Sequence, residues 1–314
     1  MYVLLGSNGN ITSRATALLL TKGAKVRVVG RSMRSLAAVE TAGAKIAVGD
    51  IADADFLGRI FVGATAVYAM IPTDYAAPDT AAAQDRLGGA IASAIAAAGV
   101  KRVVNLSSIG AHVPSGTGPI AALHRQEERL NALDGVDVLH LRCGYFYENH
   151  LAAIEMIQTI GAYVDMTAPD APLPMVATAD IAQVVARELH TPSGTGKRVL
   201  NLHAPRLYTM RESTVLLGAA IGQPELAYEQ TEPAHAKAAL MQQGFSASAA
   251  ALLAEMSTAF STGRLNGEYE KGPTEITPTT LERFAVTLFK RAVEARERTS
   301  RVAEIRSDAR ASHS

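Results

Sequence analysis

Short apolar runs alternate with helix-like stretches through the first half of the chain. The runs are short, continuous and rich in β-branched residues, as buried parallel strands are; they lie at 2–5, 26–29, 45–48, 66–70, 102–106 and 138–142. Helical patterns separate them at 11–22, 33–41, 53–61, 80–98 and 120–133. This alternation predicts an α/β fold with a doubly wound parallel sheet and right-handed crossovers.

The pattern changes after Gly144. A proline-rich connection at 168–174 leads to a predicted strand at 175–177, a helix at 180–190 and a strand at 199–203, and residues 208–260 are mostly helical in pattern. We therefore expect a nucleotide-binding α/β domain at 1–150, rejoined by 175–204. A smaller, mostly helical substrate or regulatory lobe is expected at 151–174 and 205–289, followed by a charged helix and tail at 290–314.

The turn after the first strand predicts a dinucleotide site. Two glycines three residues apart, Gly6 and Gly9, lie between an apolar strand and a helical run. A pyrophosphate is bound by bare backbone N–H groups at a helix N-terminus, and glycine lets the chain approach it closely. Gly-x-x-Gly alone is also an ordinary turn, so the prediction depends on this strand–turn–helix setting. The expected contacts are Gly6, Ser7, Asn8, Gly9, Asn10 and Ile11.

Two arginines after the second strand favour NADP(H) over NAD(H). An acidic residue near this position typically binds the ribose hydroxyls of NAD, and none lies between Ala24 and Val39. Arg31 and Arg34 stand there instead, and a guanidinium donates two hydrogen bonds to a phosphate. The alternative is that both are solvated residues of the first helical turn.

Composition narrows the class of protein. Lysine plus arginine and aspartate plus glutamate number 30 each, so the formal net charge of zero gives no general attraction to nucleic acid or anionic membranes. The one cysteine, Cys143, excludes an internal disulfide. No apolar run reaches the roughly 20 residues of a membrane span, and no signal peptide precedes the first strand. We expect a cytoplasmic protein without nucleic-acid or membrane partners.

Four further stretches resemble the NmrA-like branch of the atypical short-chain dehydrogenase/reductases. They are residues 49–51 (Gly-Asp-Ile), 105–111 (Asn-Leu-Ser-Ser-Ile-Gly-Ala), 141–149 (Leu-Arg-Cys-Gly-Tyr-Phe-Tyr-Glu-Asn) and 174–182 (Pro-Met-Val-Ala-Thr-Ala-Asp-Ile-Ala). The resemblance extends to about Phe289. It implies a Rossmann domain that binds NADP(H) and a small C-terminal lobe. The chain departs from the family's glycine motif at Thr12, where a third glycine is usual.

The resemblance also assigns positions around the dinucleotide. It implies that Asp50 and Ile51 flank the adenine. Residues Met70, Ile71 and Pro72, with Thr73, would line the ribose side, and Phe146 and Asn149 would close over the nicotinamide end.

The Tyr-x-x-x-Lys pair of the wider superfamily is absent. None of the nine tyrosines has a lysine four residues later. The helix expected to carry the pair holds His124, and some NmrA-like reductases have a histidine at about this place. A histidine can exchange a proton near neutral pH, and Glu127 or Glu128 would hold its ring. The alternative is an ordinary surface histidine on an amphipathic helix.

Ser107 and Ser108 end the fifth predicted strand, at the edge where open α/β sheets bind ligands. In the family this pair borders the nicotinamide; the alternative is a structural turn. Cys143 has no basic partner in the sequence pattern and is interpreted as a buried structural residue. The histidines show no ligand spacing, so no metal is expected.

Two functions remain open. The first is an NADPH-dependent oxidoreductase that acts on a small quinone or carbonyl acceptor in the cleft between the domains and lacks the Tyr-x-x-x-Lys pair. A quinone needs less help from a protein acid, because its reduced anion is stabilised. The second is a non-catalytic NADP(H)-binding redox sensor that acts through a protein partner. Consumption of NADPH separates them.

Overall fold

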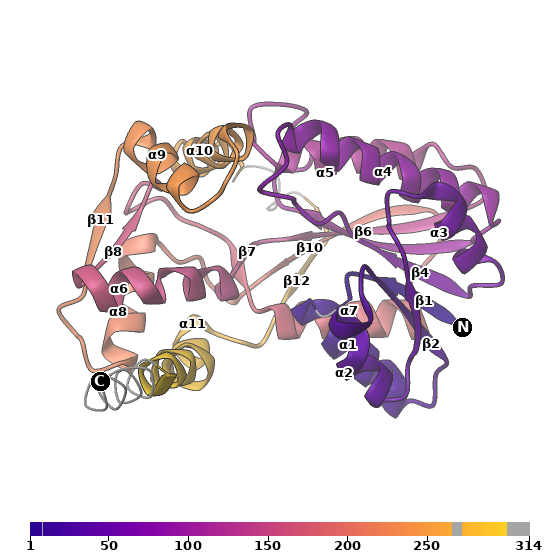
Figure 1. Cartoon of the computed structure of the whole chain (residues 1–314), viewed down its shortest axis with the longest axis horizontal. Helices are drawn as coiled ribbons and strands as arrows, with labels where there is room; N and C mark the ends of the chain where they lie inside the picture. Colours follow the sequence, from indigo (N-terminus) through magenta and orange to yellow (C-terminus); the bar gives the residue numbers. More distant parts are fainter. Residues whose placement is uncertain (8, 266–271, 300–314) are drawn as a thin grey trace, which may run out of the picture.

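An eight-stranded, all-parallel sheet forms the centre of the computed structural model, which describes residues 1–7, 9–265 and 272–299 (Figure 1). Its strand order is β12-β10-β6-β5-β4-β1-β2-β3. Their bounds are β1 Tyr2–Leu5, β2 Val26–Gly30, β3 Lys45–Val48, β4 Ala66–Ala69, β5 Arg102–Ser108, β6 Asp137–Cys143, β10 Lys197–His203 and β12 Thr274–Ile276. The order reverses at β1, where β2 lies on one side and β4 on the other. Such a switch point is where doubly wound sheets bind nucleotides.

Helices cover both faces of this sheet. One face carries α1 (Asn10–Thr21), α2 (Met33–Thr41) and α7 (Thr178–His190), and the other carries α3 (Ala54–Phe61), α4 (Thr80–Ala97) and α5 (Ile120–Asn131) (Figure 1). Side-chain oxygens of Ser32, Asp53 and Asp79 cap the N-termini of α2, α3 and α4. A separate apolar cluster packs against each face. The predicted doubly wound α/β fold is confirmed, and the predicted helix and strand bounds in this half agree to within about two residues.

A second, mostly helical region lies beyond the carboxyl ends of the strands and has its own apolar core (Figure 1). Its helices are η1 (Tyr147–Ala153), α6 (Ile154–Ile160), α8 (Met210–Ala220), α9 (Pro233–Gln242), α10 (Ala247–Ser261), α11 (Leu281–Phe284) and the π-helix η2 (Ala285–Phe289). Two small parallel pairs complete it: β7 (Tyr145–Phe146) with β9 (Met175–Val176), and β8 (Ala162–Asp165) with β11 (Ala227–Gln230). We call this region the helical lobe.

Some segments differ from their predicted places. The strand predicted at 175–177 is β9, which pairs with β7 outside the main sheet. Conversely, β12 lies in the range expected for the lobe but extends the main sheet beside β10. The strands β8 and β11 are short, and their pattern did not predict them; β8 begins with two buried residues, whereas β11 is mostly exposed. The proposed domain bounds otherwise stay a prediction, and of the predicted terminal helix the described part is helical through residue 299.

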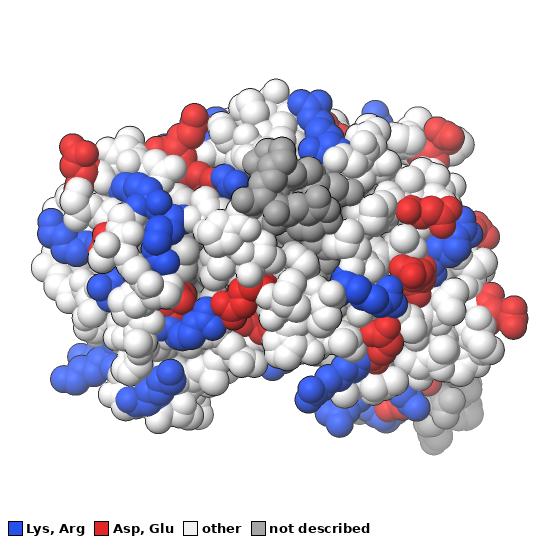
Figure 2. All heavy atoms as spheres, turned by 180° about the vertical axis from the view of Figure 1, so that it is seen from behind, with Lys and Arg blue, Asp and Glu red and all other residues white. Residues whose placement is uncertain are grey.

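The surface carries charges of both signs side by side, and no large area of one sign is visible on the face shown in Figure 2. This agrees with the balanced composition. None of the described helices is long and apolar enough to cross a membrane.

Candidate functional site

The glycine loop after β1 leaves the N-terminus of α1 open to a ligand. Gly6 has a φ of 106°, in the region that favours glycine, and Gly9 is the extended N-cap residue of α1. Among the described residues no side chain caps this helix, and its first turn has no acidic residue. Unsatisfied N–H groups and the positive end of the helix dipole suit a pyrophosphate. Of the predicted contacts, Asn8 lies outside the described residues.

Thr12, which replaces the usual third glycine, fits between β1 and α1. Its side chain is buried, and its hydroxyl donates a hydrogen bond of 2.8 Å to the Leu5 carbonyl. A Cβ added to Gly6 would lie 2.7 Å from the Thr12 Oγ1 atom. The threonine therefore fills the space beside a glycine and holds the loop, so its presence is compatible with nucleotide binding.

Arg31 and Arg34 lie beside this loop with free guanidinium groups. The Ser7 N–H donates to the Val29 carbonyl at 3.2 Å, which joins the loop to the end of β2. A Cβ on Gly30 would lie 2.6 Å from the Ser7 Cβ, so only glycine allows this approach. Both arginines are exposed, and neither has an ion-pair partner among the described residues. The two charges are available to a phosphate.

The end of β3 completes the nucleotide side of the site. The Gly49 N–H donates to the Gly30 carbonyl at 3.0 Å, which brings the next residues close to the glycine loop. Asp50 is exposed and accepts a hydrogen bond from the Ala52 N–H at 2.9 Å. Ile51 is buried. The predicted adenine contacts thus lie at the same edge of the sheet as the arginines.

A cavity of about 310 Å³ opens between the carboxyl ends of β4, β5 and β6 and the helical lobe. It includes seven predicted site residues: Met70, Ile71, Pro72, Ser107, Ser108, Phe146 and Asn149. The other lining residues are Thr73, Tyr75, Gln84, Leu106, Pro119, Ile120, Leu123, Cys143, Gly144, Tyr145, Leu253, Met256 and Phe260. No Asp, Glu, Lys, Arg or His belongs to this set, so the described wall of the cavity carries no formal charge.

The two serines line the cavity, and the hydroxyl of each donates its proton to another group of the protein. Ser107 donates its proton to the Glu127 carboxylate at 2.5 Å, and Arg142 binds the same carboxylate with contacts of 3.0 and 2.6 Å. Burial tends to raise the pKa of Glu127, but Arg142, His140 and the hydrogen bond from Ser107 together outweigh it and the pKa is lowered. Ser108 donates to the Ile109 carbonyl at 2.9 Å. With both protons engaged, the hydroxyl oxygens are left to accept hydrogen bonds from a ligand.

His124 does not line the cavity, and Leu123 lies there instead. The His124 Nδ1 lies 2.8 Å from the Ala111 carbonyl, which can only accept, so this nitrogen carries the proton. The Nε2 atom lies 3.5 Å from Glu128. Glu127, the other residue expected to hold the ring, binds Ser107 and Arg142. The predicted catalytic role of His124 therefore has no support from the geometry around it.

The cavity also contains residues that the sequence did not single out. Tyr75, Leu253, Met256 and Phe260 come from a loop and from α10, far along the chain. The three residues of α10 had only an apolar helical pattern as a signal, which is typical of any core, and Tyr75 lies in a loop. Cys143 is buried, and burial raises the pKa of its thiol, as expected of an unreactive cysteine.

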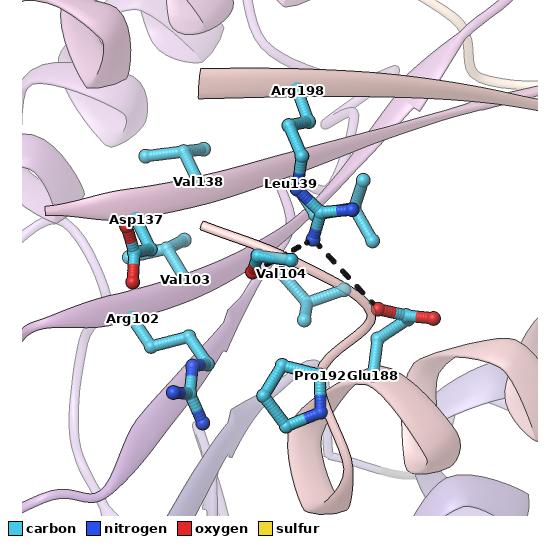
Figure 3. A pocket seen from close by; sticks show the side chains of 10 residues that line it. Arg102, Val103, Val104, Asp137, Val138, Leu139, Glu188, Pro192 and Arg198 are labelled. Atoms are coloured by element: carbon cyan, nitrogen blue, oxygen red, sulfur yellow. Dashed lines mark hydrogen bonds and ion pairs between the residues drawn. The ribbon is translucent and has the colours of Figure 1, made fainter. Parts of the chain in front are cut away.

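A much smaller cavity of about 10 Å³ lies at the opposite edge of the sheet, at the amino ends of β5, β6 and β10 (Figure 3). Glu188 there accepts hydrogen bonds from the Ser193 N–H and hydroxyl at 3.0 and 2.8 Å, and Arg198 lies 3.9 Å away. Glu188 is buried and Arg198 is partly exposed, and their contact joins the end of α7 to β10. The described residues include no group of three metal-ligating side chains.

Comparisons with known proteins agree with this arrangement. A (4-alkanoyl-5-oxo-2,5-dihydrofuran-3-yl)methyl phosphate reductase of Streptomyces griseus is 30% identical over 241 residues, which are 77% of this chain and 80% of that protein. The NADPH complex of an NADPH-dependent quinone oxidoreductase from Escherichia coli has a similar fold (TM-score 0.73, 21% identity, 92% of this chain and 100% of that chain). So does Citrobacter triphenylmethane reductase with NADP(H) (TM-score 0.73, 18% identity, 91% and 99%).

Residues 6–192, more than half of the chain, match the NAD(P)H-binding family. The match begins at the first glycine of the loop and covers β2, the cavity ends of β4 to β6, and α7. The prediction of a nicotinamide dinucleotide as cofactor is confirmed by this match. The chain belongs to the NAD(P)H-binding family.

Proposed function

We propose that this chain is an NADPH-dependent oxidoreductase of the NmrA-like branch, and that it reduces an uncharged, largely apolar quinone or carbonyl compound. The observation that carries the proposal is the uncharged cavity, which adjoins the strand ends next to the glycine loop. The bound cofactor would supply a hydride to an acceptor held in that cavity. The chain's own residues bind, orient and shield the two reactants.

The nucleotide is held by the α1 end of the site. The open N-terminus of α1 binds the pyrophosphate, and Arg31 and Arg34 bind the 2′-phosphate that distinguishes NADPH from NADH. Ser107 and Ser108 accept hydrogen bonds at the nicotinamide end, because their own protons are engaged elsewhere. The Glu127–Arg142 pair holds Ser107 in this state.

The acceptor is held by the helical lobe. Leu253, Met256 and Phe260 of α10 offer it an apolar surface, and the lobe keeps bulk water away from the reaction. The Streptomyces griseus relative acts on a phosphate ester. No cationic side chain lines the cavity described here, and burying an unpaired phosphate is costly. We therefore infer that the acceptor of this chain is uncharged.

Consumption of NADPH tests the proposal. The protein is mixed with NADPH and a panel of uncharged quinones, enones and aldehydes, and the loss of NADPH absorbance is followed with and without acceptor. Turnover that depends on both acceptor and protein is the expected result. Binding of NADPH without consumption by any acceptor would contradict it and favour the redox-sensor function.

A further inference from the structure

Tyr145 brings a phenol to the wall of the cavity. It lies in β7, directly after the turn at Gly144 that ends β6, and its ring faces Phe260 at 6.4 Å and His150 at 5.5 Å between centroids. The Tyr145 N–H donates to the Pro174 carbonyl at 2.8 Å, and a Cβ on Gly144 would lie 2.4 Å from that same oxygen, so the turn packs closely against that loop. Tyr145 is thus held in place at the boundary between the sheet and the lobe.

Behind Tyr145 lies a buried pair of polar side chains. The His150 Nδ1 atom is 2.8 Å from the Tyr163 hydroxyl, and both residues are almost fully buried. Burial lowers the pKa of His150 to about 3, so its ring is neutral. Its Nε2 atom is buried without a partner among the described residues. An unpaired buried N–H is rarer than an unpaired acceptor, so the proton is assigned to Nδ1.

This tautomer fixes the direction of the hydrogen bonds. His150 donates from Nδ1 to the Tyr163 oxygen. The proton of Tyr163 is then available to Tyr145. Burial raises the pKa of Tyr145, and hydrogen bonds from Tyr163 and Asn149 oppose that rise. Because its oxygen accepts from these donors, the proton of Tyr145 is left for the cavity.

We propose that Tyr145 is the catalytic proton donor, which gives its hydroxyl proton to the oxygen of the bound acceptor. The inference rests on the proposed function. When bound, the cofactor would supply a hydride to the acceptor carbon; as the C=O π bond breaks, Tyr145 would give its proton to the acceptor oxygen, which forms a new O–H bond. The O–H bond of Tyr145 breaks, and water that enters after product release returns the proton. One NADPH and one proton are consumed for each acceptor reduced.

The surroundings of Tyr145 suit this role. Burial raises its pKa, and the nearby Asp165 carboxylate adds to the rise, so the phenol is protonated in the resting protein and proton donation depends on the hydrogen bonds that oppose this rise. Tyr163 and Asn149 would stabilise the phenolate left behind, as the lysine of the absent Tyr-x-x-x-Lys pair does. Ser107 and Ser108 cannot replace it, because their protons are engaged with Glu127 and Ile109.

Tyr145→Phe is the direct test, because it removes the hydroxyl and keeps the ring. We expect kcat with an aldehyde or enone to fall by roughly 10²-fold, the usual scale of general acid catalysis, with the Kd of NADPH unchanged. The loss should be much smaller with a quinone, whose reduced anion is less basic. Tyr2→Phe is the matched control, since it removes a phenol hydroxyl at the amino end of β1, away from the cavity, and should retain activity.

Tyr163→Phe tests the supporting hydrogen bond. As a positioning residue, Tyr163 should affect kcat by about 3- to 10-fold and leave KM unchanged, again more with an aldehyde than with a quinone. A structural defect would instead lower the rates for both acceptor classes equally. Equal losses for both acceptor classes, or a Tyr145→Phe variant as active as the wild type, would overturn this inference and leave the proposed function standing. A wild-type protein that consumes no NADPH would overturn the proposed function and the inference with it.

Discussion

The nucleotide side and the acceptor side of the site are built in different ways. The nucleotide side consists of consecutive turns at the ends of β1, β2 and β3, joined by backbone hydrogen bonds such as that from the Gly49 N–H to the Gly30 carbonyl. The acceptor side combines strand ends with α10, which follows them by more than a hundred residues. The nucleotide side binds through main-chain groups and exposed charges, whereas the acceptor side is apolar and uncharged.

The two sides therefore have different tasks: the nucleotide side recognises the cofactor, and the acceptor side selects among acceptors. A pyrophosphate is the same in every dinucleotide, so a glycine loop and a helix terminus suffice to bind it. Acceptors differ in shape and polarity, and selectivity among them depends on side chains that surround the reacting atoms. We therefore expect substitutions on the nucleotide side to change cofactor binding, and those at the cavity to change turnover and acceptor choice.

The largest effect is expected from Gly9→Val. The backbone of Gly9 is extended, with a φ of −61°, so it accepts a side chain, and the added Cβ lies 3.2 Å from the Gly6 carbonyl oxygen. The valine would occupy the space of the pyrophosphate and remove charge-assisted bonds worth about 1.5–3 kcal/mol each. NADPH should bind about 100-fold more weakly in a calorimetric titration.

The matched control is Gly58→Val, because a Cβ at this helical glycine meets open space. It should bind NADPH as the wild type does. If a folded Gly9→Val protein also bound NADPH normally, the loop would be only a structural turn.

A smaller effect is expected from Arg31→Ala. The wild type should bind NADPH at least about 10-fold more tightly than NADH, because a charge-assisted phosphate contact contributes about 1.5–3 kcal/mol. In the variant, NADPH should bind more weakly while NADH binds as before, so most of that preference should be lost. Arg86→Ala, at an exposed arginine of α4, is the control for net charge. Equal affinities of the wild type for both cofactors would contradict the assignment.

The smallest effect is expected from His124→Ala. The ring binds the Ala111 carbonyl outside the lining of the cavity, so kcat and the Kd of NADPH should stay within about threefold of the wild type. The comparison comes from steady-state kinetics of the His124→Ala and Tyr145→Phe variants, measured side by side. A loss as large as that of Tyr145→Phe would restore His124 as the proton donor.

The sequence allows a definite prediction of the nucleotide side because its signals are local, and the individual contacts stay a prediction. Strand periodicity, Gly6, Gly9 and the arginines after β2 all lie within the first 34 residues, and each points to one structural role. The serines that end β5 and the segment from Phe146 to Asn149 also reached the cavity as expected. In each case the topology of a parallel sheet brings strand ends to one edge.

The acceptor side was less predictable because long-range packing creates it. The hydroxyl protons of Ser107 and Ser108 are committed by contacts that spacing does not show, such as the one with Glu127. His124 lies on the helix expected to carry the catalytic pair, but the rotation of that helix presents Leu123 to the cavity. Tyr145 lies in the stretch 141–149 that carries the resemblance, but no role was predicted for it, since its partner Tyr163 comes from a short strand that the pattern did not predict.

The most direct test of the central claim compares one acceptor in two forms, an uncharged quinone or enone and its phosphate ester. NADPH consumption is measured for both with the same protein preparation. The uncharged form should have a kcat/KM at least about 10-fold higher, because the described wall of the cavity offers no cation to a buried phosphate. A preference for the phosphate ester, or bound NADPH that neither form consumes, would contradict the claim.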